Sequence, residues 1–187
     1  MDSDRLAVKC ILDGDVEKFT GLVNKFYPRI VMYIWKMGIQ KEDAEDIAQE
    51  VMIKVYNNLY RYNEKWSFST WVFRIAINAY KDFKKQKRVY TTPIDDSPSP
   101  PDSFSFEEHT ERMHLKNIVK QMLGILDDDI KTIMILHYFH ELSLKEIGEI
   151  YNLSPEAVKM KLYRARGRLY KKFEKEMMGG EYCEVQL

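Results

Sequence analysis

The sequence predicts an all-α protein with two small helical domains joined by a flexible linker. Apolar residues recur at three- and four-residue intervals over most of the chain, and no useful stretch alternates with the period of a strand. Prolines, serines and acidic residues gather between Val89 and Met113, where they can neither continue a helix nor pack a core. A chain of 187 residues has room for a small domain on each side of such a linker.

The formal net charge of zero hides a segregation of charge along the chain. Residues 1–90 carry 16 basic and 12 acidic side chains, and residues 113–178 carry 12 basic and 9 acidic ones. Between them, residues 91–112 carry one basic and six acidic side chains, and residues 179–187 form a short tail. Two cationic domains therefore flank an anionic linker, which keeps a nucleic-acid partner open.

The ends of the chain point to the cytoplasm. Cys10 and Cys183 lie far apart with no paired spacing, which fits a reducing compartment. The first ten residues, MDSDRLAVKC, are too charged for a signal peptide. No apolar run approaches the roughly 20 residues that cross a bilayer, so we expect no stable membrane insertion.

Three helices are predicted before the linker. The first runs from Asp15 to Met37 and ends at Gly38, and the second runs from about Lys41 to Tyr60. A polar turn, RYNEKWS, then leads to a third helix over about residues 69–87.

The third helix is predicted to have two different faces. At about 100° per residue, one face is apolar and packs, and the other offers cations and an amide, with Trp71 at its edge. Cations hold phosphates, and aromatic and amide groups hold unstacked bases. A merely solvated basic face is the alternative, but a second basic helix in the same chain favours nucleic acid. The polar face contains Thr70, Arg74, Asn78, Lys81, Lys85 and Arg88.

The second helix has the opposite polarity on its outer face. Its apolar residues occupy one side, and Asp46, Glu50, Ile53 and Asn57 form a stripe on the other, with Gln49 beside them. Exposed carboxylates around an exposed isoleucine predict a basic protein partner, although most charged helix faces are only solvated.

The C-terminal domain is predicted to contain four helices, the last two forming a helix-turn-helix. A first helix contains Leu115 to Leu126, and Asp127 or Asp128 begins the next. The helix-turn-helix depends on local signals: a capping box of Ser143 with Glu146, closure at Asn152, and Ser154 capping a helix whose first residue is Pro155.

The last helix combines an apolar stripe with a cationic remainder. A stripe of this kind faces a domain core, and a basic helix after a short helix and a turn suits a DNA major groove. The stripe contains Val158, Leu162, Ala165, Leu169 and Phe173. The cations are Lys159, Lys161, Arg164, Arg166, Arg168, Lys171, Lys172 and Lys175.

Two clusters raise the question of catalysis. Consecutive acids at 127–129 point in different directions on a helix, and a helix start is their ordinary place. His137 and His140 share a helical face, but no Cys or carboxylate completes a zinc spacing. The sequence contains no Gly-rich phosphate loop and no nucleophile–base pair. We therefore expect no enzyme activity, no metal and no cofactor.

Three segments together resemble bacterial RNA polymerase sigma factors of the minimal two-domain, extracytoplasmic-function group. They are AEDIAQEVMIKVY (44–56), FSTWVFRIAINAYKD (68–82) and LSPEAVKMKLYRAR (153–166), in the family's order and on both sides of a linker. The resemblance implies that residues 1–90 form region 2, which docks on core polymerase and opens the minus-ten element. Residues 113–178 would then form region 4, which reads the minus-thirty-five element.

The resemblance also implies roles for individual residues. Polymerase docking is expected of Asp46, Gln49, Glu50 and Ile53. Minus-ten opening, with capture of a flipped base of the single-stranded non-template strand, is expected of Trp66, Trp71, Arg74, Asn78, Lys81, Lys85 and Arg88, with Tyr60 and Tyr62 as further candidate aromatics. At the upstream duplex, base edges are expected to meet Glu156, Ala157, Lys159 and Met160, and phosphates Ser154, Lys161, Arg164 and Arg166.

Two other functions remain open at this point. A dimeric helix-turn-helix regulator explains the last two helices but leaves the N-terminal domain without a role. A nucleic-acid enzyme would use the Asp or His clusters. If the chain is a sigma factor, the family implies core RNA polymerase and promoter DNA as partners, and an anti-sigma factor as inhibitor.

Overall fold

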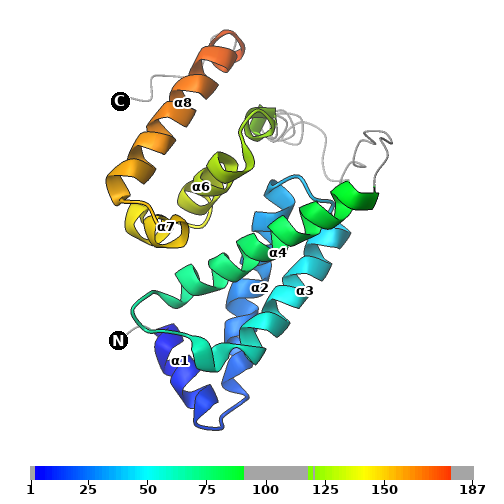
Figure 1. Cartoon of the computed structure of the whole chain (residues 1–187), viewed down its shortest axis with the longest axis vertical. Coiled ribbons are helices and arrows are strands. Elements are labelled where there is room, and N and C mark those ends of the chain that lie inside the picture. The colour runs from blue at the N-terminus through cyan, green and yellow to red at the C-terminus, as the bar shows by residue number, and fades with distance from the viewer. Residues whose placement is uncertain (1–2, 91–117, 120, 178–187) are drawn as a thin grey trace, which may run out of the picture.

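A computed structural model describes residues 3–90, 118–119 and 121–177, with the backbone alone at 88–90 and 174–177. Within these ranges every regular element is a helix, which confirms the predicted fold class (Figure 1). The predicted linker at 91–112, the tail at 179–187 and the beginning of the helix predicted from Leu115 lie outside the described residues.

The N-terminal domain contains four α-helices and one 3-10 turn. They are α1 (Ser3–Leu12), α2 (Lys18–Lys36), α3 (Lys41–Asn57), η1 (Leu59–Arg61) and α4 (Phe68–Tyr90). The sequence did not predict α1. This short helix is held by contacts with α2: Val8 and Ile11 are buried, and Asp4 pairs with Lys25 at 2.6 Å.

The boundaries of α2 and α3 follow from residues at their ends. Gly38 has φ +98°, a conformation that favours glycine, and α2 ends before it as predicted. The predicted continuation of the next helix to Tyr60 is wrong. The Asn58 side chain donates to the Lys54 carbonyl at 2.8 Å, and the chain then tightens into η1.

The C-terminal domain contains α6 (Asp128–Tyr138), α7 (Leu144–Tyr151) and α8 (Pro155–Met177), preceded by helical turns at 118–119 and 121–124. The predicted capping box is confirmed: the Glu146 amide donates to Ser143 Oγ at 3.2 Å, and the Ser143 amide donates to the Glu146 carboxylate at 2.9 Å. Asn152 ends α7 with φ +54°, and Ser154 Oγ accepts from the Ala157 amide at 3.2 Å.

The turn between α7 and α8 depends on Gly148. The Leu153 amide donates to the Gly148 carbonyl at 2.9 Å, which folds the turn back over the helix. A Cβ atom at Gly148 would lie 2.5 Å from the Leu153 carbonyl oxygen. Only glycine therefore fits here without a backbone shift.

The two domains pack against each other. In Figure 1 the C-terminal domain lies beside α4, and contacts join α4 to α7 and α2 to α6. The hydroxyls of Tyr33 and Thr132 are 3.2 Å apart, and Lys131 donates to the Met37 carbonyl at 3.0 Å. The linker length alone allowed widely separated domains, but this structure holds them closed.

Candidate nucleic-acid interface

The basic helix α8 presents its cations to solvent. The predicted apolar stripe, from Val158 to Phe173, is buried against the domain core. Glu156, Lys159 and Met160 are exposed at the beginning of the helix. Ser154, Arg164 and Arg166 are exposed, and Ala157 and Lys161 are half-buried. The domain therefore offers a duplex an exposed helix face with polar and charged side chains along its length.

The charge of Glu156 bears on what α8 could read. Hydrogen bonds from its own backbone amide and from the Ser154 hydroxyl lower the pKa of this carboxyl. An ionised carboxylate only accepts hydrogen bonds, and the exocyclic amine of cytosine is the donor it can meet in the major groove.

The acidic face of α3 is exposed as the sequence predicted. Asp46, Gln49, Glu50 and Ile53 all face solvent, and Ile53 is 60% exposed. Glu50 makes only a loose pair with Lys54 on the next turn, at 3.8 Å. The result is an accessible apolar side chain ringed by carboxylates, on the side of α3 opposite its buried residues.

The second domain engages part of the polar face of α4, which the sequence did not predict. Thr70 is fully buried and bonds to Ser67 at the start of the helix. Arg74 donates to the Glu149 carbonyl of α7 at 2.6 Å and lies over the Trp66 ring at 4.3 Å. Lys81 pairs with Asp129 of α6 at 3.1 Å. Helical periodicity placed these residues on one face correctly but could not reveal that the other domain contacts part of it.

The remaining residues of this face differ in accessibility. Asn78 and Lys85 are exposed, whereas the Arg88 side chain lies outside the described residues. Lys84, which the sequence did not single out, also reaches the second domain, where it pairs with Asp128.

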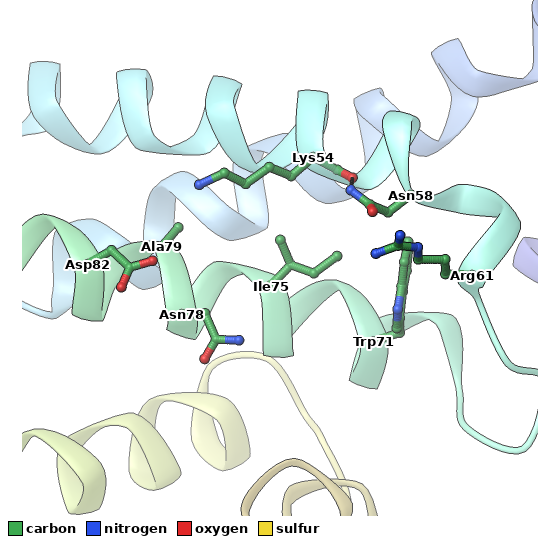
Figure 2. A pocket seen from close by; sticks show the side chains of 8 residues that line it. All are labelled: Lys54, Asn58, Arg61, Trp71, Ile75, Asn78, Ala79 and Asp82. Atoms are coloured by element: carbon green, nitrogen blue, oxygen red, sulfur yellow. Dashed lines mark hydrogen bonds between the residues drawn. The ribbon is translucent and has the colours of Figure 1, made fainter.

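A pocket of about 380 Å³ opens between α3 and α4, beside this face. Figure 2 shows Trp71 and Ile75 rising from α4, with Lys54 and Asn58 coming from the end of α3 and Arg61 from η1. Asn78, Ala79 and Asp82 complete the lining along α4. The pocket combines an aromatic ring, apolar side chains, two amides, two cations and the carboxylate of Asp82.

That lining suits an unstacked base with its phosphate. A planar base can stack on an indole, amides can bond its polar edge, and cations at the rim can hold the phosphate. Of the four candidate aromatics, only Trp71 lines the pocket. Trp66 is stacked on Arg74, the Tyr62 hydroxyl donates to the Trp66 carbonyl at 2.8 Å, and Tyr60 is 65% exposed.

Lys54, Asn58 and Asp82 line the pocket but were not predicted as site residues. Lys54 and Asn58 stand one turn apart at the end of an acidic helix, just before Arg61. A cation and an amide at that spacing would indicate a binding site only if the packing of α4 beside them were already known.

The described residues contain neither a metal-binding cluster nor a membrane-spanning helix. In these ranges no group of three His, Cys, Asp or Glu side chains could hold a metal ion. No helix in the same part of the chain is long and apolar enough to cross a membrane.

The chain matches two family models, one in each domain. The model of Sigma-70 region 2 matches residues 22–89, and the model of Sigma-70, region 4 matches residues 116–169. The match to region 2 accounts for the N-terminal domain. The alternative of a dimeric helix-turn-helix regulator leaves that domain without a role, so the match does not favour it.

Characterised relatives cover almost the whole chain. The extracytoplasmic-function (ECF) RNA polymerase sigma factor SigW of Bacillus subtilis is 31% identical, over 88% of this chain and 93% of its own. The ECF RNA polymerase sigma-E factor of Escherichia coli strain K12 is 24% identical, over 88% of this chain and 91% of its own.

Solved structures share the two-domain helical fold. CnrH, in complex with the cytosolic domain of CnrY, has a TM-score of 0.72 at 22% identity, over 93% of this chain and 99% of that one. The sigma factor RpoE of Bartonella quintana, in complex with the anti-sigma factor NepR, has a TM-score of 0.64 at 18% identity, over 84% and 98%.

Proposed function

The chain belongs to the extracytoplasmic-function sigma factors, and from this premise we propose how its parts divide the work of starting transcription. A sigma factor directs core RNA polymerase to specific promoters, and that is the function of this chain. We assign residues 1–90 to polymerase docking and minus-ten opening and residues 113–178 to minus-thirty-five recognition. The chain catalyses no reaction itself, and it works in the cytoplasm, with the nucleoid when bound to polymerase.

The pocket beside Trp71 is the observation that carries the strand-opening role. Extracting a base costs a few kcal/mol of unstacking, which a fitted pocket must offset. Trp71 would stack on a flipped non-template base, Asn78 would bond its edge, and Lys54 and Arg61 would hold the adjoining phosphates. This set of groups is complete within one domain.

The exposed face of α3 is proposed as the docking surface for core polymerase. Carboxylates around Ile53 fit a basic partner surface with an apolar centre. Changing Asp46 and Glu50 together to Ala should weaken capture of core polymerase about tenfold or more in a pull-down. Glu42 and Glu45 lie on the same helix, so their double change to Ala is the matched control. Equal losses in both variants would remove the assignment.

Run-off transcription tests the function as a whole. The purified full chain is mixed with core polymerase and a library of genomic promoter fragments, and transcripts are sequenced. We expect initiation at a set of promoters with a shared upstream and minus-ten pattern. No transcript above the level of core polymerase alone would refute the proposal.

An anti-sigma factor is the expected inhibitor. Two structural neighbours were solved as complexes, CnrH with CnrY and the Bartonella quintana protein with NepR. Capture of an anti-sigma factor by the tagged full chain, released when the inducing stress is applied, would identify it.

A further inference from the structure

The Asp82 carboxylate lines the pocket between α3 and α4, and the strand-opening role proposed above leaves it without a function. Among the described residues of that lining it is the one acid, beside cations, amides and apolar side chains. A carboxylate repels phosphates, so this end of the pocket is a poor place for the DNA backbone. A carboxylate is favourable in a site for single-stranded DNA where it meets N–H donors, and these lie on the Watson–Crick edges of bases.

The Asp82 carboxylate is available to such donors. Within the described part of the chain, Asp82 is exposed and forms no ion pair. On the neighbouring helix, by contrast, the Asp43 carboxylate is held by the Lys87 ammonium group at 2.8 Å. Both carboxylate oxygens of Asp82 can therefore accept hydrogen bonds from a ligand.

The pocket is longer than one flipped base requires. Figure 2 shows Trp71 and Arg61 at one end and Asp82 at the other. From residue 71 to residue 82 the helix axis advances by about 16 Å, whereas stacked bases are only about 3.4 Å apart. Ala79, which lies between Ile75 and Asp82, ends in a methyl group and leaves the floor of the pocket open. A base stacked on Trp71 thus leaves the Asp82 end empty.

Lys54 supplies a donor near that empty end. Figure 2 shows its side chain extending along α3 towards the end of the pocket where Asp82 lies. Its ammonium group makes only a loose pair with Glu50, at 3.8 Å. An ammonium group has three N–H donors, so one that holds a phosphate still has a donor for the carbonyl of a base.

A carboxylate together with a cationic donor distinguishes the four DNA bases. Guanine presents two neighbouring donors, its N1–H and its N2 amine, beside the O6 acceptor. A carboxylate can accept from both donors in a bidentate pair, while an ammonium group donates to O6. Cytosine and adenine each present one amine beside an acceptor nitrogen, and thymine presents one N–H between two carbonyls. Guanine alone among them therefore satisfies both carboxylate oxygens.

We propose that the end of the pocket formed by Lys54 and Asp82 binds a second unpaired base of the non-template strand and selects guanine. This base is a neighbour of the one that stacks on Trp71, and the proposal rests on the strand-opening role assigned to the pocket above. Asp82 accepts hydrogen bonds from N1–H and the N2 amine, and Lys54 donates to O6. Asp82 is thus a specificity-determining residue of minus-ten recognition.

Run-off transcription with randomised promoters tests the proposal. A promoter used by the native chain is randomised at all its minus-ten positions, and each template carries a transcribed barcode that identifies its sequence. The full chain and its variants are each combined with core polymerase. Asp82→Asn keeps the size of the side chain and removes its charge. Asp13→Asn makes the same change at an exposed acid outside the pocket and is the matched control.

We expect the native chain to favour guanine over thymine about tenfold at one minus-ten position, as a bidentate pair allows. That position should adjoin the one at which Asn78→Ala relaxes the base preference. Asp82→Asn should lose the preference for guanine, and Asp13→Asn should keep it. Inosine, which retains N1–H and O6 but lacks the N2 amine, should reduce open complex with the native chain and not with Asp82→Asn. Permanganate footprinting measures this second effect.

Three results would overturn the second base site: a native profile without a guanine position, an Asp82→Asn variant that keeps the native profile, or an Asp82-dependent preference for cytosine or adenine. Each of them, obtained with promoter-specific transcription by the native chain, rejects this inference alone. Absence of any promoter-specific transcript would instead refute the proposed function, and this inference with it.

Discussion

At the scale of single residues, Gly148 constrains the structure most directly. Its missing side chain lets the Leu153 carbonyl come within 2.5 Å of the place where a Cβ would stand. Gly167, in the middle of α8, has nothing within 4 Å of the corresponding position. The two glycines should therefore respond in opposite ways to the same substitution.

Gly148→Ala should lower the free energy of unfolding by about 1–3 kcal/mol, because backbone must move to admit the methyl group. Gly167→Ala is the matched control and should raise it by up to about 1 kcal/mol, the helix-propensity difference between the two residues. Urea unfolding of the full chain, followed by circular dichroism, measures both. A stabilising Gly148→Ala would contradict the account of the turn.

Trp71 and Asn78 should contribute differently to strand opening. Trp71→Ala removes a stacking partner, and losses of about 1–3 kcal/mol per base correspond to a roughly 5- to 150-fold fall in open promoter complex. Asn78→Ala should mainly relax the preference for one minus-ten base. Permanganate footprinting with core polymerase measures opening. Trp35→Ala, at an exposed tryptophan of α2, is the control and should open promoters normally.

At the scale of elements, local signals predicted the helix-turn-helix almost completely. Ser143, Glu146, Asn152 and Pro155 act on backbone groups within a few residues, so their effects do not depend on the rest of the fold. The faces of α3 and α4 also followed from periodicity. Helix α1 and the burial of Thr70 did not, because both depend on residues distant in sequence. The pocket escaped prediction for the same reason, since its lining comes from three elements.

Within α8, Lys159 and Arg166 should have separable effects on DNA binding. Lys159 lies near the beginning of the helix and Arg166 two turns later, and both are exposed. Lys159→Ala should change the preferred upstream bases. Arg166→Ala should weaken all sequences alike and reduce the salt slope of log K by about one. Binding selections at two salt concentrations distinguish these outcomes, and an unchanged base profile for Lys159→Ala would count against base readout there.

At the scale of the whole molecule, the closed arrangement also makes stability depend on pH. His140 is 4% exposed and lies at the interface between the two domains, where its ring centroid is 4.8 Å from that of Phe73. Burial, with Arg29 and Lys36 nearby, lowers the pKa of His140 to about 4, against 6.5 for the free side chain. As the pH falls, His140 is protonated in the unfolded chain at a higher pH than in the folded one. The contribution of neutral His140 to the free energy of unfolding is therefore fully present above pH 6.5 and is lost as the pH falls towards 4.

Between pH 7 and pH 5 this single histidine should remove about 2 kcal/mol of unfolding free energy. The loss should be missing from His140→Gln, which keeps a polar side chain but cannot titrate in that range. Urea unfolding at both pH values measures the difference for each protein. Equal losses in the two proteins would show that His140 is not the responsible group.

The sequence did not predict the interface between the two domains. Charge counts gave two cationic domains, and the linker length set no distance between them. The attraction comes instead from a few acids at one helix end and from buried polar groups that meet only in three dimensions.

The contact between Lys131 and Met37 gives domain separation a local signature. Helix α2 ends at Lys36, and its terminal Met37 carbonyl is bonded by an ammonium group from the other domain. A helix end that loses its partner frays first. The Met37 and Gly38 amides, which donate to carbonyls of the last turn, should therefore exchange with deuterium at the rate of domain opening. The exchange rates of these two amide protons at the end of α2 would thus report how often the two domains separate.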